Sequence, residues 1–233
     1  ADPRLGDRGR MLETLEQYYD GYRFARKVTE RVFNPDMVLY FLRELENKGE
    51  YPANMLDLNV RTDYGRLQRI GTLAGTGGAK RRALLESILA EGYVLSELVE
   101  QFGARSLRAD EQLISLLYYM GMLTIGPQPP DAAVPRLEIP NQVIRELQWD
   151  YLALMLKEQE QLWLDTRELE AALGAMAVQG DIGPLVSLFQ EQVVQRLGVK
   201  DQRQFNEKTL KLMLLAYISH SRMFHILSEK EFA

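Results

Sequence analysis

Apolar residues recur with helical spacing over most of the chain, which predicts a mainly helical fold. The clearest case is the stretch VFNPDMVLYFLRELENKG, where Asn34 can cap a helix, Pro35 fits its first turn and Gly49 can end it. This stretch predicts a helix from about residue 35 to residue 48. A shorter stripe of the same kind precedes it, formed by Leu12, Leu15 and Tyr19.

Two more helices are predicted before residue 100. Asp63 can cap a helix in DYGRLQRIGTL, and KRRALLESILAEG predicts another helix that ends at Gly92. The inner face of this second helix is expected to carry Leu84, Leu85, Ile88 and Leu89.

Residues 109–160 follow a different pattern. ADEQLISLLYYMG predicts a helix, MLTIG and VPRLEIP predict two short strands joined by turn-rich residues, and Asn141 can cap the next helix. Helix, two-stranded ribbon and helix is the layout of a winged-helix module, which serves in DNA binding and in protein packing alike. The first helix is expected to turn four apolar residues inward: Leu113, Leu116, Leu117 and Met120.

Residues 161–233 predict three helices and a terminal strand. Asp165 or Thr166 can cap the first helix, Asp181 and Pro184 open the second, and FNEKTLKLMLLAYISH forms the third. RMFHILSE then predicts a buried strand. Because no later strand follows to pair with it, we expect the sheet to continue beyond the sequence.

Composition limits the chemistry. The 233 residues are 46% hydrophobic and 26% charged, which fits one large or two small globular domains. There is no cysteine, and two histidines alone cannot build a zinc site. The net charge of −5 argues against a wholly basic nucleic-acid binder, although local basic patches are compatible with it. With neither a membrane span nor a signal peptide in the sequence, we expect a cytoplasmic protein without a membrane partner.

The glycine-rich stretch GTLAGTGGAKRR (71–82) raises the question of a phosphate-binding loop. A Walker A loop needs glycine directly before its lysine and a hydroxyl residue after it, but Ala79 and Arg81 flank Lys80 here. We therefore interpret this stretch as an exposed connector between helices. Its cations and two nearby arginines are candidate phosphate contacts for nucleic acid, with an ordinary solvated surface as the simpler interpretation: Arg66, Arg69, Lys80, Arg81 and Arg82.

Other side chains give weaker signals. His220 and His225 fit ordinary polar contacts better than a catalytic base. Glu207, placed on a helix before the terminal strand, could open a carboxylate–magnesium site, which Glu229 and Glu231 do not complete. Four aromatic residues could stack on bases, but their helical spacing favours a core: Tyr118, Tyr119, Trp149 and Tyr151.

Several phrases together resemble a family of predicted AAA-ATPase-like proteins fused to a PD-(D/E)XK nuclease domain, widespread in bacteria and archaea. They cover nearly the whole chain in order: YYDGYRF (18–24), VFNPDMVLYFL (32–42), ANMLDLNVRTDYGRLQRI (53–70), LLYYMGMLTI (116–125), LEIPNQVIRE (137–146) and the terminal NEKTLKLMLLAYIS and FHILSEKEFA.

The resemblance implies a middle part of such a protein: a helical ATPase-lid-like region (1–108), a winged-helix-like module (109–160) and the first helices and strand of the nuclease domain (161–233). Glu207 resembles the helix carboxylate that opens the nuclease motif. ATP and magnesium are implied only for the full-length family, whose Walker motifs would precede this sequence and whose catalytic aspartate and E-x-K pair would follow it.

We therefore expect a non-catalytic region without its own cofactor, which couples the two catalytic parts or contacts DNA. The alternative is a self-standing helical module for protein–protein interaction. A magnesium nuclease completed by a homodimer is disfavoured because no E-x-K triplet follows the terminal strand.

Overall fold

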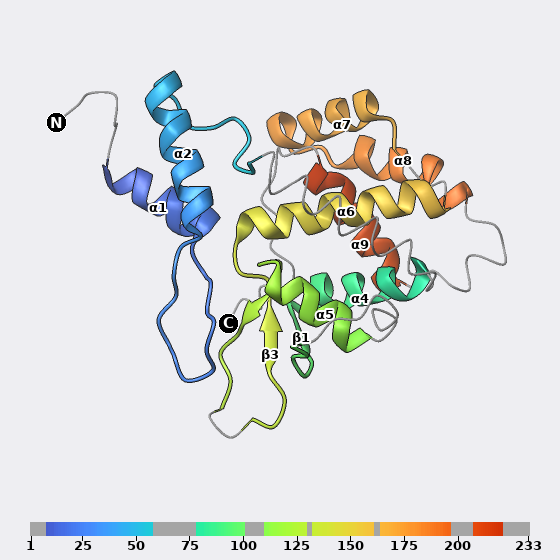
Figure 1. Cartoon of the computed structure of the whole chain (residues 1–233). Coiled ribbons are helices and arrows are strands. Elements are labelled where there is room, and N and C mark those ends of the chain that lie inside the picture. Colours follow the sequence, from blue (N-terminus) through green and yellow to red (C-terminus); the bar gives the residue numbers. More distant parts are fainter. Residues whose placement is uncertain are drawn as a thin grey trace. The chain divides into compact units, whose positions relative to one another are not determined.

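The computed structural model describes residues 8–57, 78–100, 110–129, 132–160, 164–196 and 207–220. Within them the chain is mainly helical, with one small antiparallel sheet, as predicted (Figure 1). The elements are α1 (Arg8–Tyr19), α2 (Pro35–Lys48), α4 (Gly78–Glu91), β1 (Tyr93–Leu95), α5 (Asp110–Tyr119), β2 (Thr124–Ile125), β3 (Arg136–Glu138), α6 (Gln142–Glu160), α7 (Thr166–Gln179), α8 (Gly183–Gln192), η2 (Val194–Arg196) and α9 (Glu207–His220).

The chain divides into two compact units. The first comprises residues 1–77 and 91–147, and the second comprises residues 78–90 and 148–233. The division into 1–108, 109–160 and 161–233 expected from the sequence stays a prediction.

Helix α2 of the first unit begins and ends where the sequence predicts. The Asn34 side-chain oxygen accepts hydrogen bonds from the backbone N–H groups of Asp36 and Met37, at 3.1 and 3.2 Å. Gly49 ends the helix in the left-handed conformation, with φ +73°. The helix buries Met37, Phe41 and Leu45.

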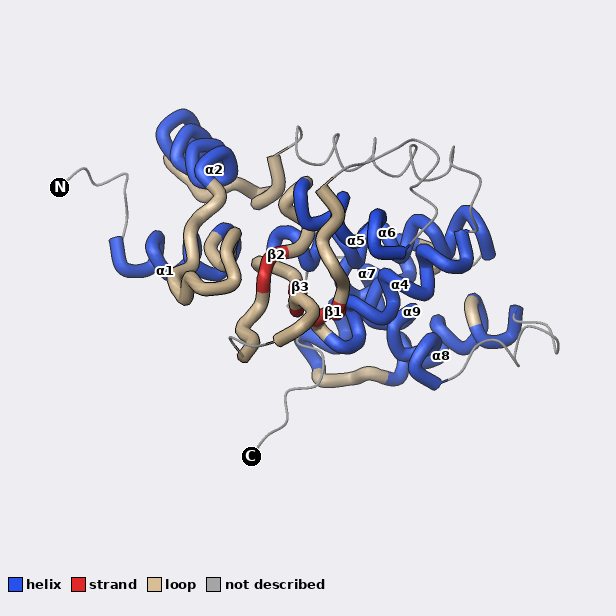
Figure 2. The backbone as a smooth tube through the Cα atoms, turned by 60° about the horizontal axis from the view of Figure 1, so that its bottom comes forward, coloured by secondary structure: helices blue, strands red, loops and turns tan. Residues whose placement is uncertain are grey.

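The strands of the first unit, red in Figure 2, form one sheet. Its strand order is β1-β3-β2, and both pairs are antiparallel. The predicted ribbon is confirmed, because β2 pairs with β3 through Thr124 opposite Glu138 and Ile125 opposite Leu137. Strand β1 was not predicted, and it pairs with the other edge of β3.

The chain after α1 covers the free edge of β2. The Thr124 hydroxyl accepts from the backbone N–H of Arg23 at 2.6 Å and donates to its carbonyl at 3.0 Å, and the Ile125 N–H donates to the same carbonyl. Tyr22 and Val32 then form an antiparallel bridge that closes a loop between α1 and α2, drawn in blue in Figure 1. An edge strand covered in this way is protected from pairing with other chains.

The prediction of which face of α5 is buried is wrong, because the helix is rotated by part of a turn relative to that prediction. Instead of the four predicted residues Leu113, Leu116, Leu117 and Met120, the buried ones are Ile114, Ser115 and Tyr118. Met120 is exposed, and the three leucines are half-buried. Ser115 sets this face, because its hydroxyl donates to Glu111 O at 2.6 Å and accepts from the N–H of Val99 at 2.9 Å. A buried hydroxyl needs such partners, whereas a leucine finds apolar contacts at several rotations.

Within its described residues the second unit consists of helices. Along α4 the predicted inner face is confirmed, with Leu85, Ile88 and Leu89 buried and Leu84 half-buried. Asp165 caps α7, which Gly180 ends at φ +70°. Helix α7 contacts α8, and the side chain of Gln192 bonds both the Asp165 N–H and the Glu168 carboxylate.

Helix α9 is the third predicted helix of this region, and it buries Leu212, Met213, Ala216 and Tyr217. Two other predictions lie outside the described residues: the helix after Asp63 and the strand RMFHILSE.

Candidate functional site

The structure places only part of the predicted phosphate-contacting set. Lys80, Arg81 and Arg82 lie in the first turns of α4, as predicted, although the helix begins two residues earlier, at Gly78. Residues 71–77 of the predicted connector lie outside the described residues. The side chains of this triplet, together with Arg66 and Arg69, lie outside what the structure describes. Their contact with nucleic acid stays a prediction.

Glu207 is the first residue of α9 and its side chain is exposed. Among the described residues no three His, Cys, Asp or Glu side chains gather as a metal site would require. The carboxylates expected near it, Glu229 and Glu231, lie outside the described part, as does His225.

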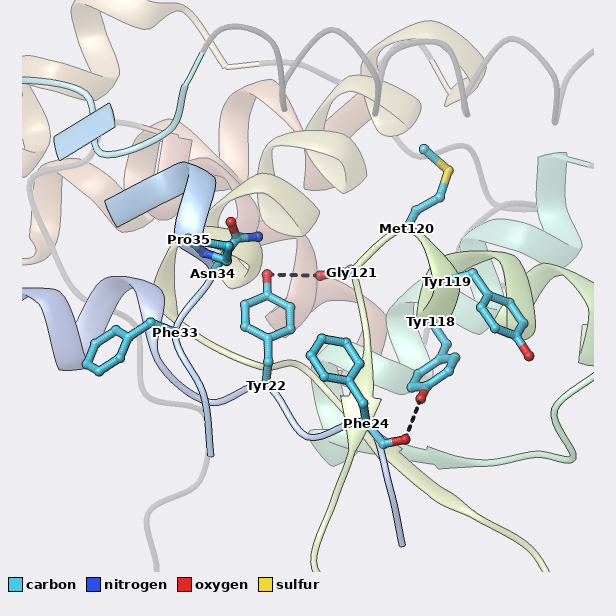
Figure 3. A pocket seen from close by; sticks show the side chains of 9 residues that line it. All are labelled: Tyr22, Phe24, Phe33, Asn34, Pro35, Tyr118, Tyr119, Met120 and Gly121. Carbon is cyan, nitrogen blue, oxygen red and sulfur yellow. Dashed lines mark hydrogen bonds between the residues drawn. The ribbon is translucent and has the colours of Figure 1, made fainter. Parts of the chain in front are cut away.

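The first unit contains a hollow of about 380 Å³ between the chain that follows α1 and the end of α5 (Figure 3). We call it the aromatic hollow. Its lining is mostly aromatic, with one amide: Tyr22, Phe24, Phe33, Asn34, Pro35, Tyr118, Tyr119, Met120 and Gly121.

Hydrogen bonds to backbone oxygens hold two of its tyrosines. The Tyr22 hydroxyl donates to Gly121 O at 3.1 Å, and the Tyr118 hydroxyl points to Phe24 O at 3.4 Å (Figure 3). Gly121 has φ +73°, and a Cβ there would lie 3.5 Å from the Tyr22 ring. Burial raises the pKa of Tyr22, while the nearby Asn34 and Asn141 side chains oppose the rise. Tyr22 is therefore a neutral structural wall of the hollow.

The sequence prediction of a core role for the aromatic residues is confirmed in part. Tyr118 and Trp149 are buried, and Tyr151 is half-buried. Tyr119 is 50% exposed at the rim of the aromatic hollow, so its prediction as a core residue is wrong. Its neighbour Tyr118 takes the buried position because of the rotation of α5.

An apolar groove adjoins the aromatic hollow, since the two share Phe33 and Pro35. It measures about 390 Å³ and runs between α1 and α2, lined by Leu12, Leu15, Phe33, Pro35, Val38 and Leu39. Leu39 of α2 is 59% exposed here. The hollow and the groove together form one apolar surface on the first unit.

Neither α5 nor the described part of the loop from β2 to β3 carries a lysine or arginine. Helix α5 has Asp110 and Glu111 in its first turn and no cation in its sequence, DEQLISLLYY. In the following β2–β3 connection, the first cation is Arg136 on β3. A helix that binds the phosphates of duplex DNA normally presents cations, so α5 does not offer this chemistry.

Positive charge gathers instead in the loop between Tyr22 and Val32. This basic loop, residues 23–31 with the sequence RFARKVTER, contains four cations and one acid. The overall composition does not indicate this basic loop, because the net charge of the whole chain is negative. The signal that could have found it is local: four cations within nine residues between two predicted helices.

Glu138 on β3 lies among arginines from three segments. Arg31 Nη2 lies 3.8 Å from its Oε1, and Arg136 Nε lies 4.0 Å from its Oε2. Burial lowers the pKa of Arg145, and the Glu138 carboxylate opposes this effect. The Arg136 guanidinium also lies 3.9 Å from the ring centroid of Tyr93. The arrangement leaves positive charge in excess around one carboxylate.

Comparisons with known proteins identify no relative. No protein-family model matches the sequence, and neither the curated proteins nor the solved structures give a match. Within the part of the chain that the structure describes, none of the helices combines the length and the apolar character needed to cross a membrane.

Proposed function

We propose that this chain is a non-catalytic coupling region of a cytoplasmic protein of the ATPase–nuclease type, and that its first unit docks protein through the aromatic hollow and the apolar groove. The family part of this proposal rests on the resemblance of the sequence phrases. The docking part rests on the exposed apolar surface.

The observation that carries the docking proposal is the continuity of this surface across α1, α2 and α5. Leu39 and Tyr119 are each at least half exposed, and Phe33 lines both the aromatic hollow and the apolar groove. Exposed apolar area of this kind is costly in water and is typical of interaction sites. A segment with apolar side chains at helical spacing, such as an amphipathic helix of the ATPase or nuclease part, is the occupant that such a groove suits.

The topology supports a winged-helix-like arrangement of the first unit. A helix, α5, stands between β1 and β2 in the chain, and the strand order β1-β3-β2 brings the first strand beside the last. Because α5 carries two acids and the exposed Tyr119 without cations, we propose that this module packs against protein and does not place α5 in a DNA groove.

Glu207 and the cations Arg66, Arg69, Lys80, Arg81 and Arg82 keep their proposed roles as an incomplete nuclease carboxylate and as phosphate contacts. The alternative of a self-standing interaction module uses the same apolar surface, but its occupant would be a separate protein.

The coding sequence on both sides distinguishes the two proposals. In-frame sequence for a phosphate-binding loop upstream and for a G-x-x-D phrase followed by E-x-K downstream supports the coupling region. A start and a stop at these ends supports the self-standing module. Purified chain that hydrolyses ATP with ordinary turnover, above about 1 s⁻¹, would contradict both.

A further inference from the structure

The basic loop, residues 23–31, is a candidate binding surface whose cations the docking proposal does not use. The bridge between Tyr22 and Val32 closes it, and the N–H of Val28 donates to Ala25 O in a turn at its tip. Arg26, Lys27 and Arg31 are all exposed. The loop is thus a defined, cationic projection in a chain of net charge −5.

Contacts to the β2–β3 loop and to β3 extend this positive surface. Arg26 Nη1 donates to Ala132 O at 3.4 Å, a weak bond that brings the two loops together. Arg31 shares the Glu138 carboxylate with Arg136 of β3. Since a single carboxylate serves both arginines, it cannot neutralise the local charge. Among the described residues, no ion pair that the structure defines involves Arg26 or Lys27.

An aromatic ring stands exposed beside these cations. Phe24 is 65% exposed, and its ring stacks on that of Tyr22 with an interplanar angle of 15° and a centroid distance of 6.1 Å. Tyr22 is itself fixed by its bond to Gly121 O. The Phe24 ring lies beside that of Tyr22 (Figure 3), and its exposed surface is available to a ligand.

We propose that the basic loop binds single-stranded nucleic acid, with backbone phosphates on Arg26 and Lys27 and a base stacked on Phe24. Cations that follow the backbone and an aromatic ring that takes a base are the two features common to sites for single strands. A duplex keeps its bases within the stack and gives Phe24 nothing to bind. An acidic protein segment would use the cations but would not need a planar partner for the ring.

This binding site shares Phe24 with the lining of the aromatic hollow, but its phosphate contacts are the loop cations, whereas docking depends on Phe33, Leu39 and Tyr119. Either proposal can fail without the other.

Fluorescence anisotropy with a labelled 20-nucleotide oligothymidylate measures the binding of single-stranded nucleic acid to the full chain. The double variant Arg26→Gln, Lys27→Gln should bind about tenfold more weakly at 50 mM salt and should lower the log–log salt slope by about 1.4, as expected for two lost phosphate contacts on a single strand. The control Arg43→Gln, Arg167→Gln removes the same charge from exposed positions on α2 and α7 and should change affinity less than about twofold. Equal weakening in both variants would overturn the assignment to the loop.

An abasic oligonucleotide of the same length isolates the stacking contact, since it keeps every phosphate. It should bind roughly tenfold more weakly than oligothymidylate, and Phe24→Ala should remove that difference while Phe24→Tyr keeps it. Equal affinity of the wild-type chain for both oligonucleotides would overturn the base contact. Tighter binding of a duplex, or competition by polyglutamate at equal charge concentration, would overturn the choice of ligand.

Circular dichroism and the unfolding midpoint confirm that each variant is folded. If the double variant unfolds, Lys27→Gln alone carries the test, because the Lys27 side chain is exposed, and its slope should fall by about 0.7. An unchanged slope in that folded variant would overturn the proposal.

Discussion

Gly21 lies directly against the carbonyl group of Pro140. Its φ is +110°, and a Cβ at this position would stand 1.9 Å from the Pro140 oxygen. The contact joins the chain that leaves α1 to the residue before Asn141, whose side chain accepts from the Ile144 N–H at the start of α6. Two of the phrases that carry the family resemblance, YYDGYRF and LEIPNQVIRE, thus meet at a point where only glycine fits.

Replacing Gly21 by alanine should destabilise the first unit strongly. Both the unfavourable φ and the overlap with backbone atoms oppose a side chain here, and we expect a loss of about 3 kcal/mol or more in the free energy of unfolding. Urea denaturation followed by circular dichroism measures it.

Gly49→Ala is the matched control. Gly49 also has a positive φ, of +73°, but a Cβ added there would meet nothing within 4 Å, so only the conformational cost of about 1–2 kcal/mol applies. Equal losses in the two variants would show that the close approach to Pro140 contributes nothing.

The Tyr22 hydroxyl should contribute measurably to stability. Tyr22→Phe removes its bond and leaves Gly121 O without this donor, which we expect to cost about 1–2 kcal/mol. Tyr118→Phe, whose hydroxyl lies at the longer distance of 3.4 Å from Phe24 O, should cost less than about 1 kcal/mol. The reverse order in urea denaturation would contradict this account of the hollow's walls.

Asn34 should stabilise α2 through its side-chain cap. Asn34→Ala leaves the N–H groups of Asp36 and Met37 without that acceptor and should cost about 1 kcal/mol. Asn34→Asp retains an acceptor oxygen and should remain within about 0.5 kcal/mol of the wild type. If both substitutions cost the same, the cap is not the cause.

Ionisation of Tyr19 should lower the free energy of unfolding at alkaline pH. Burial raises its pKa above the ordinary value of 10.0, with further increases from Tyr40, Tyr18 and Glu146. The folded chain therefore favours the neutral phenol. That preference is fully present below pH 10 and is lost as the pH rises above it toward the folded-state pKa.

The variant Tyr19→Phe tests this effect. At pH 7 it should be less stable than the wild type by about 1 kcal/mol, because it lacks the bond from the hydroxyl to Met55 O at 2.8 Å. At pH 11 the gap should shift in favour of the variant by about 1.4 kcal/mol. A difference in unfolding free energy that is the same at both pH values would contradict the alkaline effect.

The elements that the sequence predicts well are those with local signals. Asn34, Gly49, Asn141 and Asp165 mark helix ends through their own backbone and side-chain chemistry, so α2, α6 and α7 could be placed without knowledge of the fold. The β2–β3 ribbon could be predicted from the turn residues between its strands.

What the sequence could not predict depends on distant partners. Strand β1 has three residues, only half-buried or exposed, and is defined by its pairing with β3 more than forty positions away. The rotation of α5 depends on Ser115, whose hydroxyl accepts a hydrogen bond from the distant N–H of Val99. The aromatic hollow likewise requires the Tyr22 hydroxyl to bond to Gly121 O. The spacing of apolar residues along the sequence does not predict this long-range contact.

Photo-crosslinking from position 119 tests the docking proposal most directly. The product of the complete gene would carry p-benzoylphenylalanine in place of Tyr119, or, as a control, in place of Val178, which is 85% exposed on α7. We predict that irradiation joins position 119, but not position 178, to one apolar segment of the ATPase or nuclease part of the same protein. Adducts to no protein, or equal yields from both positions, would contradict the docking of protein on the aromatic hollow.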